Sequence, residues 1–344
     1  MGNTTISWTD KVWNPVTGCT KVSAGCKNCY AEKMAKRFWG KRKFTDIICH
    51  EDRLNIPLKI KKPFKWFVNS MSDLFHESVS FDFIDKVFAM MALCPQHTFQ
   101  ILTKRPERML EYFSGKRPGY IGQAAIDLRK EKNINQDSCI LPLGRGYGGE
   151  QWFPLKNVWL GVSVSRPEDL ENIRYLLQCE AAVRFLSIEP MLKNIIPDLK
   201  KYLFFTGNND EFYCEWCGGF KYNNNHDCYD SKSGIDWIIV GGESGRNARA
   251  MHPDWVLLIK NECELAEIPF FFKQWGEWMP SELWDPRLAP NKQLAMKPNG
   301  EIIGPDIVPQ EVGAQRLLKI GVKIAGCLLD GKEYKQFPEI KNEN

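Results

Sequence analysis

The chain has no long apolar stretch, no secretory signal at its start and no large excess of charge. No segment reaches the roughly 18 consecutive apolar residues that a membrane-spanning helix requires, so we expect no membrane partner. Residues 1 to 6 have no basic segment followed by an apolar one, and Ile6 stands where a myristoylation motif needs Ser or Thr. We therefore predict a cytoplasmic protein.

The formal net charge is only +4, which permits an acidic partner without requiring one, because nucleic-acid-binding proteins often carry a far stronger basic bias. Hydrophobic residues make up 43% and charged residues 26% of the 344 residues, as in an ordinary globular protein with a sizeable core. Twelve cysteines in a long chain without a signal indicate metal or redox use rather than disulfides.

The most distinctive segment is residues 19 to 30, Cys-Thr-Lys-Val-Ser-Ala-Gly-Cys-Lys-Asn-Cys-Tyr. Cys19, Cys26 and Cys29 have the spacing Cys-x6-Cys-x2-Cys, and no fourth cysteine follows closely. A [4Fe–4S] cluster held entirely by protein takes four thiolates. Three predict a cluster with one open iron, which a small chelating molecule can occupy. The alternatives are a zinc site completed by His50 or a distant ligand, and unconnected buried cysteines.

With Tyr-Ala after its last cysteine, this loop resembles that of radical S-adenosylmethionine (radical SAM) enzymes, and in that detail their spore photoproduct lyase branch. The first gap is longer than in the commonest spacing, Cys-x3-Cys-x2-Cys. The wider chain is similar to a phage- and prophage-associated family of unassigned function within this superfamily. The matching stretches are Trp-Asn-Pro-Val-Thr-Gly-Cys (13–19), Asn-Ser-Met-Ser-Asp-Leu-Phe-His-Glu (69–77), Ile-Leu-Thr-Lys-Arg-Pro (101–106), Leu-Ser-Ile-Glu-Pro (186–190), Ile-Val-Gly-Gly-Glu-Ser-Gly (239–245) and Phe-Lys-Gln-Trp-Gly-Glu-Trp (272–278).

The resemblance implies a [4Fe–4S] cluster, S-adenosylmethionine chelated at its open iron, and an electron donor such as flavodoxin or ferredoxin. In that chemistry an electron from the cluster breaks the sulfonium bond, and the 5′-deoxyadenosyl radical takes a hydrogen atom from the substrate. The lyase-like loop and the basic stretch from Lys33 to Lys43, which contains Phe38 and Trp39, favour a nucleic-acid base or nucleotide-like substrate, in modification or lesion repair. A peptide substrate is an alternative, and the stretch is otherwise a solvated basic face.

Two functions of another class remain open. One is a non-catalytic nucleic-acid-binding module in which iron–sulfur and zinc sites are structural staples. The other is a redox sensor whose DNA affinity changes when its cluster is oxidised. A binding module needs no open iron, so that position distinguishes it from the enzyme.

Strand and helix patterns alternate along the chain, which predicts an α/β fold with a parallel sheet. The resemblance favours a partial (β/α) TIM-type barrel of about six parallel strands; an open, doubly wound sheet is the second choice. We expect the barrel in residues 1–278 and a C-terminal appendage in 279–344. Predicted strands cover residues 6–13, 65–70, 98–103, 158–164, 183–188, 237–240 and 270–273; predicted helices cover 31–39, 81–93, 167–178, 253–266 and a segment that begins after Pro106.

Two segments interrupt this repeat. Residues 114–156 are expected to be irregular, as a flexible surface insertion or, less simply, a glycine-rich phosphate loop. Residues 207–234 are expected to bind a structural Zn²⁺, because four zinc-type ligands close such a site. A loose polar loop and an auxiliary iron–sulfur cluster are the alternatives there. The zinc ligands predicted are Cys214, Cys217, His226 and Cys228.

Several predicted strands end in polar residues, which converge on one face if the strands are parallel. As implied by the resemblance, Lys104 would pair with the carboxylate of S-adenosylmethionine, Tyr30 would stack near the adenine, and serines or carboxylates would accept from its amine or ribose. Strand-end capping is the structural alternative. The predicted cofactor-binding residues are Tyr30, Ser70, Ser72, Asp73, Lys104, Ser163, Ser187, Glu189, Gly241, Gly242 and Glu243. His76, as a proton carrier, and Glu189 are the candidate catalytic residues; His76 is otherwise a structural histidine.

Overall fold

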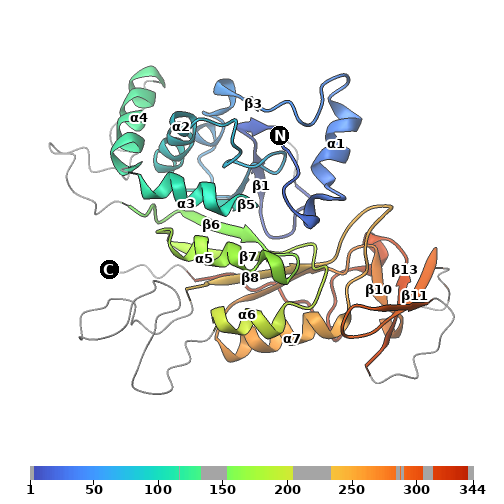
Figure 1. The fold of residues 1–344 in the computed structure, drawn as a ribbon. Coiled ribbons are helices and arrows are strands. Elements are labelled where there is room, and N and C mark those ends of the chain that lie inside the picture. Colours follow the sequence, from blue (N-terminus) through green and yellow to red (C-terminus); the bar gives the residue numbers. More distant parts are fainter. Residues whose placement is uncertain are drawn as a thin grey trace, which may run out of the picture.

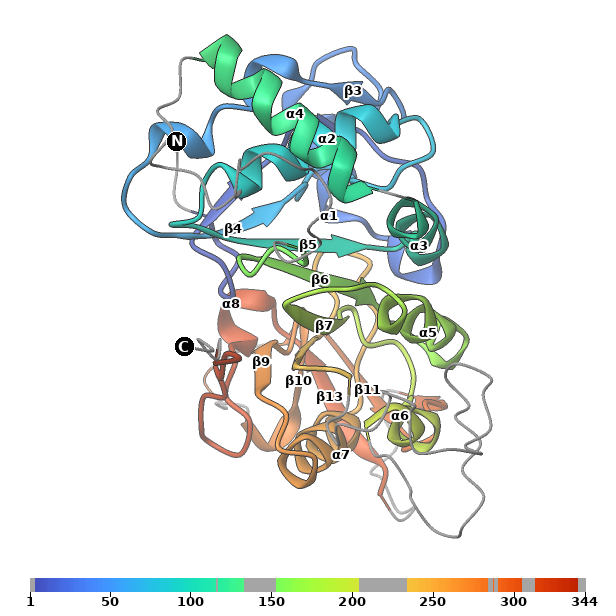
Figure 2. The ribbon, with the colours of Figure 1, turned by 90° about the vertical axis from the view of Figure 1, so that its left-hand side faces the viewer.

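The main sheet has seven parallel strands in the order β1-β4-β5-β6-β7-β8-β9, and it curls into a half-barrel (Figures 1 and 2). An α/β fold with a partial barrel is therefore confirmed, with seven parallel strands where about six were expected. The strands are β1 (Lys11–Trp13), β4 (Lys65–Val68), β5 (Thr98–Thr103), β6 (Val158–Ser163), β7 (Val183–Ile188), β8 (Trp237–Gly241) and β9 (Phe270–Gln274).

Helices follow most of these strands and cover the convex face of the sheet (Figure 2). Ser80 begins α2 by accepting a hydrogen bond from the Phe83 amide, and Pro106 and Pro253 occupy first-turn positions where a missing N–H costs nothing. The helices are α1 (Tyr30–Phe38), α2 (Phe81–Ala92), α3 (Pro106–Ser114), α4 (Arg117–Lys132), α5 (Glu171–Leu177), α6 (Ile196–Leu203), α7 (Pro253–Leu265) and the short α8 (Val322–Ala325).

The computed structural model describes residues 4–115, 117–132, 153–203, 234–283, 287, 290–304 and 313–339. The predicted zinc ligands Cys214, Cys217, His226 and Cys228 lie outside the described residues, as does the glycine-rich motif at 144–149. Within these ranges, no helix combines the length and the apolar character needed to cross a membrane.

Side chains alternate between the two faces of a strand, and this divides the core into two layers. Val68, Ile101 and Val162 belong to the large cluster shared with the helices. Their neighbours along the strands point into the concave side, where an aromatic floor fills the half-barrel. Trp8 and Phe337, from the two ends of the chain, pack onto that floor. Its members from the strands are Phe67, Trp159, Phe185, Trp237, Ile239 and Phe271, with Val183 beside them.

Two smaller sheets flank the half-barrel. β2 (Val16–Thr17) pairs with β3 (Ile48–Cys49) beside the start of the cysteine loop. A four-stranded antiparallel sheet has the order β10-β13-β11-β12 and lies beside the carboxyl ends of the main strands (Figure 1). Its strands are β10 (Trp278–Pro280), β11 (Lys292–Met296), β12 (Ile302–Gly304) and β13 (Gln315–Lys319).

Two sequence predictions about local structure were wrong. The segment 114–156 is not irregular throughout, because α4 occupies residues 117–132 and buries Ile121 and Ala125 against α2. The predicted strand at 6–13 is shorter, since only β1 pairs with β4; Trp8 instead lies on the aromatic floor, where the Gln100 side chain donates to its carbonyl. The boundary near residue 278 between a barrel and an appendage stays a prediction.

Candidate functional site

The cysteine loop, residues 18–29, lies over the carboxyl ends of the main strands. Gly25 shows how closely it approaches them. A Cβ at Gly25 would stand 2.6 Å from Ser165 Oγ and 3.6 Å from both Lys104 Cε and Pro190 Cδ, which belong to the ends of β5, β6 and β7. The predicted convergence of the loop and the strand ends is therefore confirmed.

A polar layer of side chains lies between this loop and the aromatic floor. The polar layer consists of residues that stand two or four positions beyond a concave-facing residue of their strand, so alternation directs them to the concave side: Lys104, Ser163, Ser187, Glu189 and Lys273. Lys104 Nζ donates to Ser163 Oγ at 2.9 Å, and Lys273 Nζ donates to Glu189 Oε1 at 2.7 Å. The layer thus offers hydroxyls, one carboxylate and two ammonium groups in a sheltered space.

Glu189 lies against Gly241, since a Cβ there would be 3.3 Å from Glu189 Cδ. Backbone can approach a ligand at Gly241 with only a flexible side chain beside it. Gly242 differs, because its Cβ would be 1.9 Å from the Trp275 carbonyl oxygen. Gly242 therefore allows the end of β8 to pack closely against the end of β9. This contact does not support its predicted role, which was to let the backbone approach a ligand.

The three loop cysteines are all free thiols and half-buried. Burial alone raises the pKa of the Cys26 thiol, but the positive charge of Lys104 and hydrogen bonds from Val22 and Ser23 outweigh it, so the pKa lies below its ordinary value. Burial, together with the Asp73 carboxylate, raises the pKa of Cys19 to about 11. Because the thiolate is the metal-binding form, Cys26 is the better prepared of the two.

Arg105, a residue that sequence reasoning did not single out, ties the first part of the cysteine loop to the sheet. Its guanidinium donates to Cys19 Sγ at 3.5 Å, to the Thr20 carbonyl at 3.1 Å and to Thr20 Oγ1 at 2.8 Å. It also pairs with the buried Asp73 and with Glu77. Arg105 therefore positions Cys19.

Asp73 is occupied by protein donors. Its carboxylate accepts from Thr103 Oγ1 at 2.7 Å and from the amides of Phe75 and Lys104, in addition to the Arg105 contact. These bonds give Asp73 a structural role in joining the turn after β4 to the turn after β5. Its predicted contact with S-adenosylmethionine would have to compete with all of them.

His76 is buried and acts on the cysteine loop through Thr20. Its Nδ1 accepts from the Ser78 amide at 3.1 Å, which assigns the ring proton to Nε2, and Nε2 lies 2.9 Å from Thr20 Oγ1. Burial, assisted by the charge of Arg105, lowers the pKa of His76, so the ring is neutral at pH 7. This bonding supports the structural alternative for His76 more than the proton carrier.

Glu243 anchors the second part of the loop. This buried carboxylate accepts from Arg249 Nε at 2.9 Å and from the Asn28 side chain at 3.0 Å, and Arg249 Nη2 donates to the Ala24 carbonyl at 3.0 Å. Burial opposes ionisation of Glu243, but the hydrogen bonds from Arg249 and Asn28 lower its pKa below the ordinary value. These contacts give Glu243 a role in holding the loop, and its predicted contact with the cofactor stays a prediction.

Three further predicted residues lie at the start of the loop and of α1. Ser70 and Ser72 donate to Asn14 Oδ1 and the Val16 carbonyl. The Tyr30 hydroxyl donates to the Ser70 carbonyl at 2.6 Å, while its side chain is half-exposed. Ser165, by contrast, has a buried hydroxyl for which no hydrogen-bond partner is found among the described residues. It faces Gly25 of the cysteine loop.

No group of three or more His, Cys, Asp or Glu side chains is arranged to hold a metal ion within the part of the chain that the structure describes. His50, the alternative fourth zinc ligand, lies beside β2, with its Nε2 at 2.8 Å from Thr17 Oγ1. Cys19 and Cys26 are nevertheless close enough to influence each other electrostatically.

A family model described as "Protein of unknown function (DUF5131)" matches residues 3–338. The chain belongs to this family. No curated protein and no solved structure matches the chain. The DUF5131 family match spans nearly all of the sequence, and therefore both the cysteine loop and every strand of the half-barrel.

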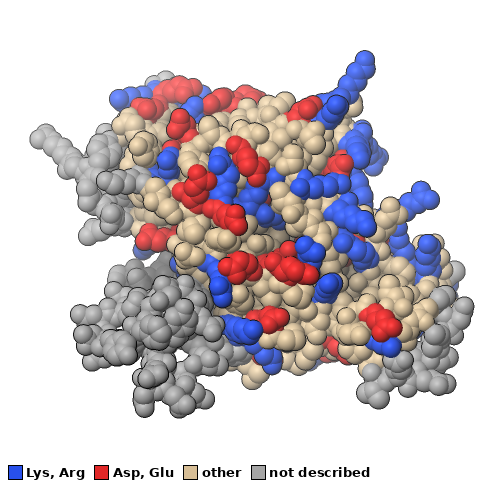
Figure 3. Space-filling model, in the orientation of Figure 1, with Lys and Arg blue, Asp and Glu red and all other residues tan. Residues whose placement is uncertain are grey.

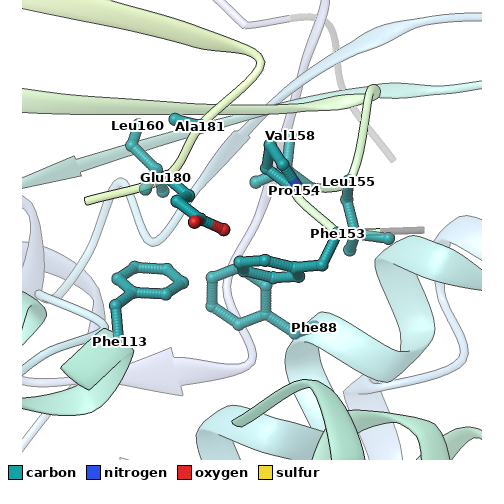
Figure 4. Close-up of a pocket in the computed structure, with 9 residues that line it drawn as sticks. All are labelled: Phe88, Phe113, Phe153, Pro154, Leu155, Val158, Leu160, Glu180 and Ala181. Carbon is teal, nitrogen blue, oxygen red and sulfur yellow. The ribbon is translucent and has the colours of Figure 1, made fainter. Parts of the chain in front are cut away.

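Two hollows lie away from the cysteine loop. An apolar cavity at the amino ends of β6 and β7 has a volume of only about 10 Å³, far below the roughly 300 Å³ of ordinary ligand pockets (Figure 4). It is lined by Phe88, Phe113, Phe153, Pro154, Leu155, Val158, Leu160, Glu180 and Ala181. A second hollow, between α2 and α4, is lined mostly by polar and acidic residues. Neither hollow is lined by a residue of the polar layer.

We predict that Arg105→Gln lowers the free energy of unfolding by about 3–5 kcal/mol, because it leaves the buried Asp73 carboxylate without its charged partner. Urea unfolding measures this change. Arg174→Gln is the control, since Arg174 pairs with the exposed Glu171 on the surface of α5 and its loss should cost less than about 1 kcal/mol. Equal stability of the two variants would contradict the role given to Arg105.

A second prediction concerns acid stability. The folded-state pKa of Glu243 is lowered, so its contribution is present above its unfolded pKa and is lost as the pH falls through the folded value. Glu243→Gln should be less stable than the wild type by about 1.5–3 kcal/mol at pH 7, and this difference should shrink at acidic pH. Urea midpoints at several pH values measure it. Glu264→Gln, at an exposed helical ion pair, should show a small difference at every pH.

Proposed function

We propose that this chain is a radical SAM enzyme whose substrate is a nucleic-acid base. One observation carries the proposal: a loop with three free thiols lies over a polar layer at the carboxyl ends of a parallel half-barrel. Chemistry in (β/α) barrels takes place at this end of the strands. Cys19, Cys26 and Cys29 would hold a [4Fe–4S] cluster and leave one iron for S-adenosylmethionine.

The donor set is one that a cluster uses. A [4Fe–4S] cluster presents a separate iron to each thiolate, and the loop carries three free, half-buried thiols. The lowered pKa of Cys26 favours the form that binds iron.

When bound, the cluster and S-adenosylmethionine supply reductive cleavage of the sulfonium and hydrogen abstraction from the substrate. The chain's own residues position and shelter this chemistry. Lys104 would neutralise the cofactor carboxylate, and Glu189, held in place by Lys273, would accept from the cofactor amine. Ser165 would satisfy its buried hydroxyl against the cofactor. The aromatic floor closes the inner end and excludes water.

Charge on the outer face supports a polyanionic substrate. Figure 3 shows Lys and Arg side chains gathered along the edge of the molecule where α1 lies, and the carboxyl ends of the main strands point toward that edge in Figure 1. A substrate reaching the polar layer would therefore pass a basic surface. This arrangement favours phosphate over an uncharged partner.

The test is anaerobic reconstitution with iron and sulfide, followed by addition of S-adenosylmethionine and dithionite. Release of 5′-deoxyadenosine and methionine is the expected result. A fully loaded cluster that yields neither product would overturn the proposal and would favour the non-catalytic nucleic-acid-binding module.

A further inference from the structure

Helix α1 inverts the usual burial pattern of a surface helix. It packs on the protein through Ala31 and Ala35 and exposes Tyr30, Met34 and Phe38, of which 47%, 42% and 63% respectively are accessible. A surface helix ordinarily buries its large apolar residues and exposes its small or charged ones. Met34, Ala35 and Phe38 lie on one face at helical spacing, and the structure buries only the alanine. The exposed stripe therefore needs an occupant.

The three exposed residues form one line that leads away from the cysteine loop. They are four positions apart, so they stand about 6 Å from one another along the helix axis. The line begins at Tyr30, next to Cys29, where the Tyr30 hydroxyl is held by the Ser70 carbonyl. Aromatic and thioether groups at such exposed positions stack on flat apolar surfaces.

Cations flank this line. Lys33 and Arg37 are exposed beside it, and neither has an ion pair among the residues that the structure describes. The Arg37 guanidinium lies 5.1 Å from the Phe38 ring centroid, and the Arg42 guanidinium lies 4.1 Å from that of Trp39. Lys36 differs, because it pairs with Glu32. Unpaired cations beside stacking groups are complementary to a polymer that alternates phosphates with flat rings.

We propose that this face of α1, Tyr30–Met34–Phe38 with Lys33 and Arg37, is a track for single-stranded nucleic acid. The 6 Å spacing exceeds the approximately 3.4 Å rise per base of a duplex strand, so it fits bases that are unstacked and drawn apart. Met34 and Phe38 stack on bases, and Lys33 and Arg37 contact phosphates. The track leads one nucleotide towards the cysteine loop. This direction rests on the proposed function, whereas binding along α1 does not.

The test is fluorescence polarisation of the full-length protein with a labelled single strand about 15 nucleotides long, as DNA and as RNA, and with the matching duplex. The variant Met34→Ala/Phe38→Ala should weaken single-strand binding by about tenfold or more, because each stacked base contributes that order of affinity. The variant Lys33→Glu/Arg37→Glu should weaken binding at low salt and reduce the slope of log affinity against log salt by about 1.4 or more. Binding of either the DNA or the RNA strand supports the track, and the strand that binds more tightly identifies the sugar that the track prefers.

The matched controls are Leu265→Ala, which truncates an apolar residue 72% exposed on α7, and Lys61→Glu, which reverses an exposed charge at the opposite end of β4. Both should bind like the wild type. The proposal is overturned if the α1 variants bind like the controls, or if the duplex binds as tightly as the single strand. Release of 5′-deoxyadenosine without nucleic acid reports separately on the proposed function, so failure of one does not imply failure of the other.

Discussion

Cys26→Ser should fold normally and lose nearly all of its iron. After anaerobic reconstitution the wild type should hold about four irons per chain, whereas a cluster left with two protein thiolates should not survive desalting. Formation of 5′-deoxyadenosine should fall by at least about 100-fold. Serine preserves the size of the side chain at this half-buried position, so loss of iron would reflect lost ligation and not unfolding.

Cys49→Ser is the matched control for this experiment. Cys49 is also a free, half-buried thiol, but it lies in β3, opposite Val16 and outside the cysteine loop. Burial raises its pKa, so it is a poor thiolate. This variant should keep its iron and its activity. Retention of full iron by Cys26→Ser, or equal loss from both variants, would show that the cysteine loop does not hold a cluster in the way described.

Gly242→Ala should be the most damaging single-methyl change in the half-barrel. The new Cβ would overlap the Trp275 carbonyl oxygen at 1.9 Å and the backbone nitrogen of Gly276 at 3.2 Å, and backbone atoms cannot rotate away as a side chain can. We expect a loss of about 3 kcal/mol or more in the free energy of unfolding, or insoluble protein. Urea or thermal unfolding measures it.

Two glycines give the comparison that makes this result interpretable. Gly241→Ala meets only the flexible Glu189 side chain at 3.3 Å, so it should fold with less than about 1 kcal/mol lost, while S-adenosylmethionine binding weakens. Gly119→Ala, with nothing within 4 Å in helix α4, should gain about 0.5–1 kcal/mol. A Gly242→Ala protein as stable as Gly241→Ala would contradict the packing described for β8 and β9.

The half-barrel could be predicted because its signals are local. The apolar runs that form β5, β7 and β9 each end in a polar residue and precede a turn. The same pattern therefore predicted the position of each strand and the place of Lys104, Glu189 and Lys273 at its end. Helix α4 was missed because Pro118 and Gly119 stand in its first turn. A helix tolerates them there, but both residues have low helix propensity, so the sequence alone does not favour a helix. The strands β10 to β13 were missed because they are short and separated by proline-containing segments.

The supports of the cysteine loop could not have been found in the same way. Arg105 reaches Cys19 across 86 positions of sequence, and Arg249 reaches Ala24 across 225. Arg105 belongs to the matching stretch 101–106, but that stretch does not indicate which side chain reaches the loop, and Arg249 lies outside every matching stretch. The same limit applies to Asp73 and Glu243: their carboxylates suit a ligand, and only the fold shows that each is also paired with an arginine.

The most direct measurement of the central claim is electron paramagnetic resonance of the anaerobically reconstituted, reduced protein, recorded with and without S-adenosylmethionine. We predict a reduced [4Fe–4S] signal that changes when S-adenosylmethionine is added, because the cofactor becomes a ligand of the iron that no cysteine occupies. A signal unchanged by the cofactor, or protein that takes up only zinc at Cys19, Cys26 and Cys29, would contradict the account.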